Sequence, residues 1–204
     1  MRYGRAADLK IHLYAVRLQR ALRAEETETL MKLLPPERRA RLERLSRPEL
    51  AGEPLCAYAA LRTALRELYG WASLPPMTCG RWGKPGFPDY PDVCFNLSHT
   101  RGAVLVGIHD QPIGVDIEKL RPVSERMLRR VGGAATEREF FERWVRGESR
   151  CKRSGFGLAG SHTAAAPAPE NERFWYPAVF AGYAACVCTC SDAELAPLRR
   201  FVLE

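Results

Sequence analysis

The chain has 204 residues and a formal net charge of +7, from 31 lysine and arginine residues against 24 aspartate and glutamate residues. Hydrophobic residues make up 46% and charged residues 27%, which are ordinary globular values and exclude a disordered or collagen-like chain. The length suits one domain or two small fused halves. The positive charge favours a polyanionic partner, such as nucleic acid, an anionic membrane, a phosphorylated cofactor or an acidic protein, without choosing among them.

No stretch is typical of a membrane span or a secretion signal. The longest nearly apolar run, residues 178–188, is far shorter than the roughly 20 residues that cross a bilayer. Residues 1–10 carry charge throughout, unlike the apolar centre of a signal peptide. The 7 cysteines are odd in number and scattered, which favours a reducing compartment over a disulfide framework. We therefore expect a cytoplasmic protein with no membrane partner.

The first half of the chain mixes strand and helix patterns. Alternation of apolar and polar residues predicts strands, a period near 3.6 predicts helices, and Gly and Pro mark the ends. The predicted elements are a strand at 10–17, a helix at 24–34, a very basic helix that opens at Pro36, a helix through Tyr58 and Leu68 that stops at Gly70, a Pro/Gly-rich loop at 74–91, and strands at 93–97 and 103–109.

The second half continues the mixture. The predicted elements are a strand at 113–118 that forms a hairpin with 103–109, a helix capped by Thr136 and running to about Arg153, a patternless loop at 159–171, strands at 173–180 and 183–190, and a final helix from Ser191 through Leu198. Alternate cysteines of a strand are about 6.8 Å apart, so Cys186, Cys188 and Cys190 fit small buried strand residues better than a zinc site. The mixed pattern, without a clear repeat, predicts an α+β fold.

Two carboxylates share one face of the predicted strand at 113–118. Asp116 and Glu118 are two residues apart, so strand alternation places them together, opposite an apolar face. Gly114 beside them leaves room for a close neighbour. Such a pair is most often a solvated face, and metal binding is the alternative.

The predicted helix after Thr136 supplies a third carboxylate. Glu148 continues the stripe of Phe141 and Trp144, and Lys152 lies one turn further. Glu148 and Lys152 form either an ordinary surface pair or an inward-facing functional group. Three acids from a strand and a helix could hold Mg²⁺, a hard ion that prefers oxygen ligands and bridges phosphates.

Two loops add groups that suit phosphate. The adjacent Ser98 and His99 follow a predicted strand, where local capping or a phosphate contact is possible but a Ser-His nucleophile pair is not. Lys84 lies in a Gly-Lys-Pro turn that lacks the glycine spacing of a P-loop. Together with the carboxylates, these residues predict a site for a polyphosphate and Mg²⁺.

Four blocks of the sequence occur in a specific order and spacing. They are WGKP at 82–85, FNLSHT at 95–100, PIGVDIE at 112–118, and a helix motif from Trp144 through Glu148 to Lys152 that is followed by GFGL at 155–158. These blocks resemble the 4′-phosphopantetheinyl transferases, of the type that activates surfactin synthetase and other nonribosomal peptide or polyketide synthases. The likeness is densest over residues 81–158 and continues faintly in the first strand and in the basic segment 34–45.

The resemblance implies a pseudo-twofold α+β fold, with two similar halves and the active site between them. Residues 1–109 would hold the basic helix and the loops that bind coenzyme A, and residues 110–204 the magnesium ligands, the catalytic residues and the carrier-protein surface. It implies Mg²⁺-dependent transfer of 4′-phosphopantetheine from coenzyme A to a serine of an apo acyl or peptidyl carrier protein, with release of 3′,5′-ADP. Coenzyme A and the carrier protein are the expected partners of a monomeric chain.

The functional residues implied by the resemblance follow from position. Asp116, Glu118 and Glu148 would bind Mg²⁺, and Glu148 would also be the base that deprotonates the serine. Lys152 would hold a phosphate or steady Glu148. The further contacts to the coenzyme A phosphates would come from Arg38, Arg41, Lys84, Ser98 and His99.

The sequence departs from the family pattern at three places. Gly147 stands where a lysine is usual, and the segment 129–136 is shorter than the corresponding segment of the family. Glu53 falls where the family has a coenzyme A-binding arginine, in a segment, 52–54, that should interrupt a helix. These departures motivate an alternative, a degenerate relative that binds carrier protein or coenzyme A without transfer. A nucleic-acid-binding protein is a third hypothesis, but the arginines cluster in one short helix without stacked aromatics, so we expect no nucleic-acid partner.

Overall fold

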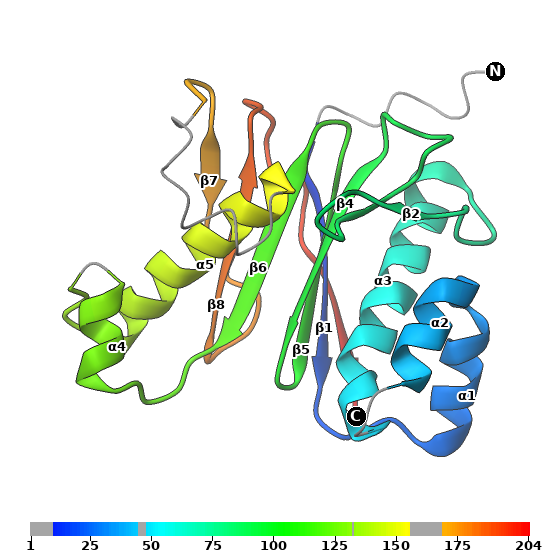
Figure 1. The fold of residues 1–204 in the computed structure, drawn as a ribbon, viewed down its shortest axis with the longest axis horizontal. Coiled ribbons are helices and arrows are strands. Elements are labelled where there is room, and N and C mark those ends of the chain that lie inside the picture. Colours follow the sequence, from blue (N-terminus) through cyan, green and yellow to red (C-terminus); the bar gives the residue numbers. More distant parts are fainter. Residues whose placement is uncertain (1–9, 45–47, 132, 156–168) are drawn as a thin grey trace.

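The computed structural model describes residues 10–44, 48–131, 133–155 and 169–204 (Figure 1). The helices are α1 (Ala24–Lys32), α2 (Pro36–Glu43), α3 (Gly52–Tyr69), α4 (Glu125–Arg130) and α5 (Glu137–Ser154), with a 3₁₀ turn at Pro48–Ala51. The strands are β1 (His12–Leu18), β2 (Thr78–Cys79), β3 (Pro85–Gly86), β4 (Cys94–Thr100), β5 (Ala103–His109), β6 (Ile113–Lys119), β7 (Arg173–Trp175), β8 (Tyr183–Thr189) and β9 (Arg199–Leu203).

Two sheets pack face to face between two long helices (Figure 1). The first sheet has the strand order β4-β5-β1-β9, and the second has the order β6-β8-β7. The inner faces of both sheets share one apolar core, which includes Leu13, Leu105, Val115 and Val187. On the outer faces, α3 covers the first sheet and α5 the second, each through its own core. This mixed α and β architecture agrees with the predicted fold class.

Two glycines let these layers approach closely. A Cβ on Gly107 of β5 would lie 2.5 Å from Val115 Cγ1 in the opposite sheet. A Cβ on Gly114 of β6 would lie 1.9 Å from the Ser149 carbonyl oxygen of α5. Since real Cβ atoms cannot come so near to backbone atoms, only glycine at position 114 allows α5 to lie directly on β6.

The long helices of the two halves have features in common. Both α3 and α5 have 18 residues and end at a glycine with positive φ, Gly70 and Gly155. The pseudo-twofold relation between the halves, and their division between residues 109 and 110, stay predictions. The last strand does return to the first half, because β9 pairs with β1 in parallel.

The structure corrects several local predictions. The final helix is wrong: residues 191–198 form no helix, and the chain ends in β9. Pro197 has no N–H for a helix interior, and the backbone of Ile11 instead pairs with Glu194 and Ala196. The hairpin of 103–109 with 113–118 is also wrong, because β6 pairs with β8 and crosses the face of β5. The strand predicted at 173–180 is only β7, three residues long.

Most other predicted elements are confirmed. Pro36 opens α2, and Thr136 caps α5 by accepting a hydrogen bond from the backbone N–H of Glu139 at 3.1 Å. Cys186 and Cys188 are buried in β8, whereas Cys190 lies just beyond the strand and is only partly buried. The segment 52–54 does not interrupt a helix but begins one, α3. Most of the predicted loop at 159–171, and GFGL beyond Gly155, lie outside the described residues. No helix in the described ranges is long and apolar enough to cross a membrane.

Candidate active site

Side chains of β4 complete the free edge of β6. Asn96 Oδ1 accepts a hydrogen bond from the Val115 N–H at 2.9 Å, and Ser98 Oγ accepts one from the Ile117 N–H at 3.3 Å. Successive even-numbered residues of β4 face β6 because strand side chains alternate. The first sheet is therefore joined to the second by side chains, and Ser98 lies directly beside Asp116.

Asp116 is the centre of a buried polar cluster. Asp116 as a whole residue is only 4% exposed. Its Oδ1 accepts hydrogen bonds from Ser98 Oγ at 2.8 Å and from Lys152 Nζ at 2.6 Å, and Lys152 also donates to Ser98 Oγ at 2.8 Å. The other oxygen, Oδ2, is buried without a hydrogen-bond partner among the described residues. Strands β4 and β6 and helix α5 each contribute one group to this cluster.

The other two predicted carboxylates lie within electrostatic range of Asp116. Glu118 Oε2 accepts a hydrogen bond from Thr100 Oγ1 at 3.2 Å. Burial, and next the negative charge of Asp116, raise the pKa of Glu118. Burial and then Asp116 also raise the pKa of Glu148, against the opposing charge of Lys152. Carboxylates that raise one another's pKa favour a cation or a proton between them.

The carboxylate side chains of this cluster are of the chemical type that binds Mg²⁺. Mg²⁺ takes carboxylate oxygens, and Asp116 Oδ2 is a buried oxygen that lacks a partner in the described part of the chain. The described residues hold no group of three His, Cys, Asp or Glu side chains already gathered closely enough to bind an ion. In the structure, Lys152 supplies the positive charge at Asp116. The three-carboxylate magnesium set therefore stays a prediction.

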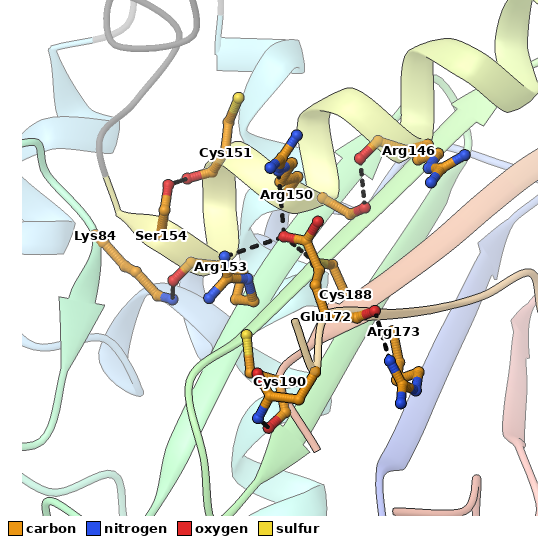
Figure 2. Close-up of polar contacts among 12 residues, drawn as sticks. Lys84, Arg146, Arg150, Cys151, Arg153, Ser154, Glu172, Arg173, Cys188 and Cys190 are labelled. Atoms are coloured by element: carbon orange, nitrogen blue, oxygen red, sulfur yellow. Dashed lines mark hydrogen bonds and ion pairs between the residues drawn. The ribbon is translucent and has the colours of Figure 1, made fainter. Parts of the chain in front are cut away.

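Lys84 lies against α5. Its Nζ donates hydrogen bonds to the carbonyl oxygens of Ile113 and Arg153, both at 2.9 Å, so it ties the last turn of α5 to the start of β6. Figure 2 shows the contact with Arg153. Burial lowers the pKa of Lys84 to about 8. The sequence predicted a phosphate contact here, and the structure adds a contact that holds α5 in place.

Two of the remaining predicted cations, His99 and Arg38, have described side chains, and neither contacts the Asp116 cluster directly. His99 lies at the surface, where partial burial of its ring and then the charge of Lys152 lower its pKa. Arg38 donates a hydrogen bond to Cys79 Sγ in β2, so α2 contacts the short β2–β3 hairpin that also carries Lys84. The side chain of Arg41 lies outside the described residues.

Glu53 is engaged at the start of α3. Its Oε1 accepts a hydrogen bond from the Gly102 N–H at 3.0 Å, which holds the turn between β4 and β5. Gly102 has a φ of 74°, so this turn needs glycine. A carboxylate at this position therefore has a local role, and the same charge acts on nearby His99.

Sequence reasoning missed three members of the site. Asn96 supports the β6 edge, Thr100 donates to Glu118, and Arg121 lies 3.5 Å from the same Glu118 oxygen. A signal for the first two was present, because Asn96, Ser98 and Thr100 are polar at every second position of β4. Arg121 follows the strand in a loop, where alternation gives no direction.

The fold and the cluster indicate a class of protein. Lys152 contacts Asp116 where α5 packs on β6, Glu118 and Glu148 lie within electrostatic range, and this arrangement suits an enzyme that acts on phosphate groups. The chain is 31% identical over 160 residues to 4′-phosphopantetheinyl transferase Sfp of Bacillus subtilis (strain 168). The aligned residues cover 72% of this chain and 71% of that protein. It is 29% identical over 160 residues to 4′-phosphopantetheinyl transferase ffp of Bacillus subtilis, with the same coverage. No protein-family model matches the chain.

These comparisons establish the family. The chain belongs to the 4′-phosphopantetheinyl transferases, of the Sfp type, and is by that membership a transferase.

Proposed function

We propose that this chain transfers 4′-phosphopantetheine from coenzyme A to a serine of an apo acyl or peptidyl carrier protein, in a Mg²⁺-dependent reaction that releases 3′,5′-ADP. Family membership supports the reaction class. The observation that supports it most within the molecule is Asp116, a buried carboxylate with one oxygen on Lys152 and Ser98 and the other without a described partner.

Asp116, Glu118 and Glu148 are the proposed ligands of Mg²⁺. When bound, the ion would neutralise the pyrophosphate of coenzyme A, which is the main electrostatic demand of phosphoryl transfer. Burial of Asp116 keeps water from competing for the same oxygen. Lys152 holds Asp116 in orientation through its ammonium group and can also meet a phosphate oxygen.

Glu148 is the proposed general base. The serine oxygen attacks the phosphorus that carries pantetheine, its proton passes to Glu148 directly or through water, and the bond to the bridging oxygen breaks so that 3′,5′-ADP leaves. A raised pKa suits this role, because a base works best when its pKa is near the pH of the reaction. His99, Ser98, Lys84, Arg38 and Arg41 are the proposed phosphate contacts.

The deciding experiment follows the mass of an apo carrier protein incubated with coenzyme A, Mg²⁺ and the chain. We expect a gain equal to phosphopantetheine, lost with a chelator and with Asp116→Ala, provided that the variant keeps the circular dichroism spectrum of the wild type. Transfer by Asp116→Ala at the wild-type rate would contradict the proposed metal site. Several apo carriers from fatty-acid, polyketide and peptide synthases would show which class is the substrate.

A second function, binding without transfer, is motivated by the charge of Glu53, which would oppose the coenzyme A phosphates. Glu53 stands near the proposed phosphate contact His99 and places negative charge there. In that case calorimetry would detect binding of coenzyme A or carrier protein, while no carrier tested would gain mass.

A further inference from the structure

A buried ion-pair cluster lies on the side of α5 that faces β7. Glu172, just before β7, has a side chain only 4% exposed. Its Oε1 lies 3.2 Å from Arg150 Nε and 3.1 Å from Arg153 Nη2, and Cys188 Sγ of β8 lies 3.7 Å away (Figure 2). One buried carboxylate thus receives two guanidinium groups from the last turns of α5.

The same turns of α5 carry the proposed catalytic side chains. Because successive residues are about 100° apart around a helix, Glu148 and Lys152 point to one side while Arg150 and Arg153 point to another. Lys152 contacts Asp116, and its neighbour Arg153 contacts Glu172. A rotation of α5 about its axis would therefore break both contacts together.

Two contacts to the backbone of α5 already restrain the helix on β6. Gly114 lets the backbone of α5 rest directly on β6 at Ser149 and Arg153, so α5 cannot move closer to the sheet. Lys84 holds the Arg153 carbonyl oxygen from another direction. Gly114 and Lys84 contact the backbone of α5, whereas Glu172 forms ion pairs with its side chains on the side near β7.

We propose that Glu172 is a positioning residue for the transfer reaction: its carboxylate, by holding Arg150 and Arg153, sets the rotation of α5 that directs Lys152 at Asp116 and Glu148 toward the substrates. This inference rests on the proposed function for its kinetic consequence. Its structural consequence, the Lys152–Asp116 contact, does not depend on any activity.

The kinetic test compares Glu172→Gln with Glu142→Gln, which removes an exposed ion pair with Arg138 on the same helix. Misplacement of reacting groups by fractions of an ångström to 1 Å lowers rates on the order of 10- to 100-fold, so we expect a loss of that size in kcat for Glu172→Gln. The KM for coenzyme A should change less than kcat does, since of the proposed phosphate contacts only Lys152 lies on α5. Glu142→Gln should match the wild type. An unchanged kcat in a folded Glu172→Gln variant would overturn the proposal.

A second variant separates positioning from stability. Loss of one partner from a buried ion pair is strongly destabilising, whereas replacement of both partners by apolar residues is often neutral. The double variant Glu172→Met, Arg153→Met should therefore melt near the wild-type temperature, since the remaining Arg150 is 37% exposed and can be hydrated, but it should keep the low kcat of Glu172→Gln. A double variant that regains both stability and kcat would show that Glu172 only stabilises the fold.

A readout without substrate uses the side-chain NMR signal of Lys152, assigned by its loss in Lys152→Met. Asp116→Asn defines the chemical shift of Lys152 without its ion pair. We expect Glu172→Gln to move the Lys152 signal toward that value, and Glu142→Gln to leave it in place. An unmoved signal would overturn the proposal. Absence of transfer by the wild type, with the signal moving as expected, would contradict the proposed function and leave the positioning role supported.

Discussion

At the scale of single residues, the site combines charges that oppose one another. Asp116 is buried and paired with Lys152, while Glu118 and Glu148 have raised pKa values because they are buried near it. A positive ion among them would relieve this repulsion. The Lys152 ammonium group relieves it only in part, because it contacts one oxygen of one carboxylate. The charge state of the three carboxylates therefore depends on which cation lies beside each of them.

Glu148 should control the pH dependence of transfer. Glu148→Gln keeps the size of the side chain but cannot accept a proton, so we expect kcat to fall by about 10²-fold or more. Because the pKa of Glu148 is raised, the wild-type rate should increase as the pH rises through that value, where the base form appears. Steady-state kinetics over a pH series measures both effects. An unchanged kcat would make Glu148 a surface partner of Lys152.

Glu53 offers a test of the departure from the family pattern. Glu53→Arg should lower the KM for coenzyme A several-fold at low salt with little change in kcat, and added salt should shrink the gain. The arginine cannot accept the Gly102 N–H, so the variant should also lose about 1 kcal/mol of stability. Glu53→Gln is the control, since its amide oxygen keeps that hydrogen bond. If Glu53→Arg leaves the KM for coenzyme A unchanged, Glu53 lies away from coenzyme A.

At the scale of elements, α5 is the helix whose placement determines the site. It rests on β6 through Gly114, and it is held by Lys84 and by Glu172. Gly147, in contrast, lies in the exposed interior of α5, and a Cβ there would meet nothing within 4 Å. The lysine usual in the family would therefore fit at this position without steric conflict.

These two glycines should respond in opposite directions to alanine. Gly114→Ala should destabilise the protein by at least about 3 kcal/mol, because its Cβ would collide with backbone that cannot yield. Gly147→Ala should stabilise it by about 1 kcal/mol, the usual gain from alanine in an exposed helix interior. Urea unfolding of both variants against the wild type measures the difference. Equal effects would mean that α5 does not rest on β6 as described.

At the scale of the whole molecule, the first and last strands of the described chain pair in the first sheet. Strand β9 pairs with β1, and Arg199 of β9 forms an ion pair with Glu67 of α3 at 3.1 Å. Chain termination after Leu198 would expose the β1 edge and the apolar residues beneath it. We expect a clear loss of melting temperature in scanning calorimetry. A truncated chain as stable as the full one would contradict the pairing of β9.

Stability of the whole molecule should also report on the carboxylates. A carboxyl group whose pKa is raised on folding binds its proton more tightly in the folded chain, so its contribution to stability is lost as the pH rises through the folded pKa. Glu118→Gln should therefore be more stable than the wild type at about pH 7 and no more stable at about pH 4. Mg²⁺ should raise the melting temperature of the wild type more than that of the variant. A variant that is less stable than the wild type at both pH values would contradict the raised pKa.

The sequence alone determined the local structure and the chemical type of the site. Alternation placed Asp116 and Glu118 on one face, and the Thr136 cap located α5, because both signals depend only on neighbouring residues. The same local logic was wrong for the final helix and the hairpin, where Pro197 and pairing partners distant in sequence decided the outcome. The motif residues also carried the resemblance that the relatives confirm.

Only the tertiary structure decided which groups meet. Ser98, Asp116 and Lys152 come from three elements, and their contact depends on the glycine that lets α5 rest on β6. The contacts of Lys84, Glu53 and Glu172 join segments separated by 16 to 69 residues, and no periodicity links such positions. Local patterns specify the direction of a side chain within its own element, whereas its partner depends on how close-packed layers fit together. For that reason the sequence predicted the residue types of the site, and the packing of α5 on the second sheet, beside β4 of the first, arranged them.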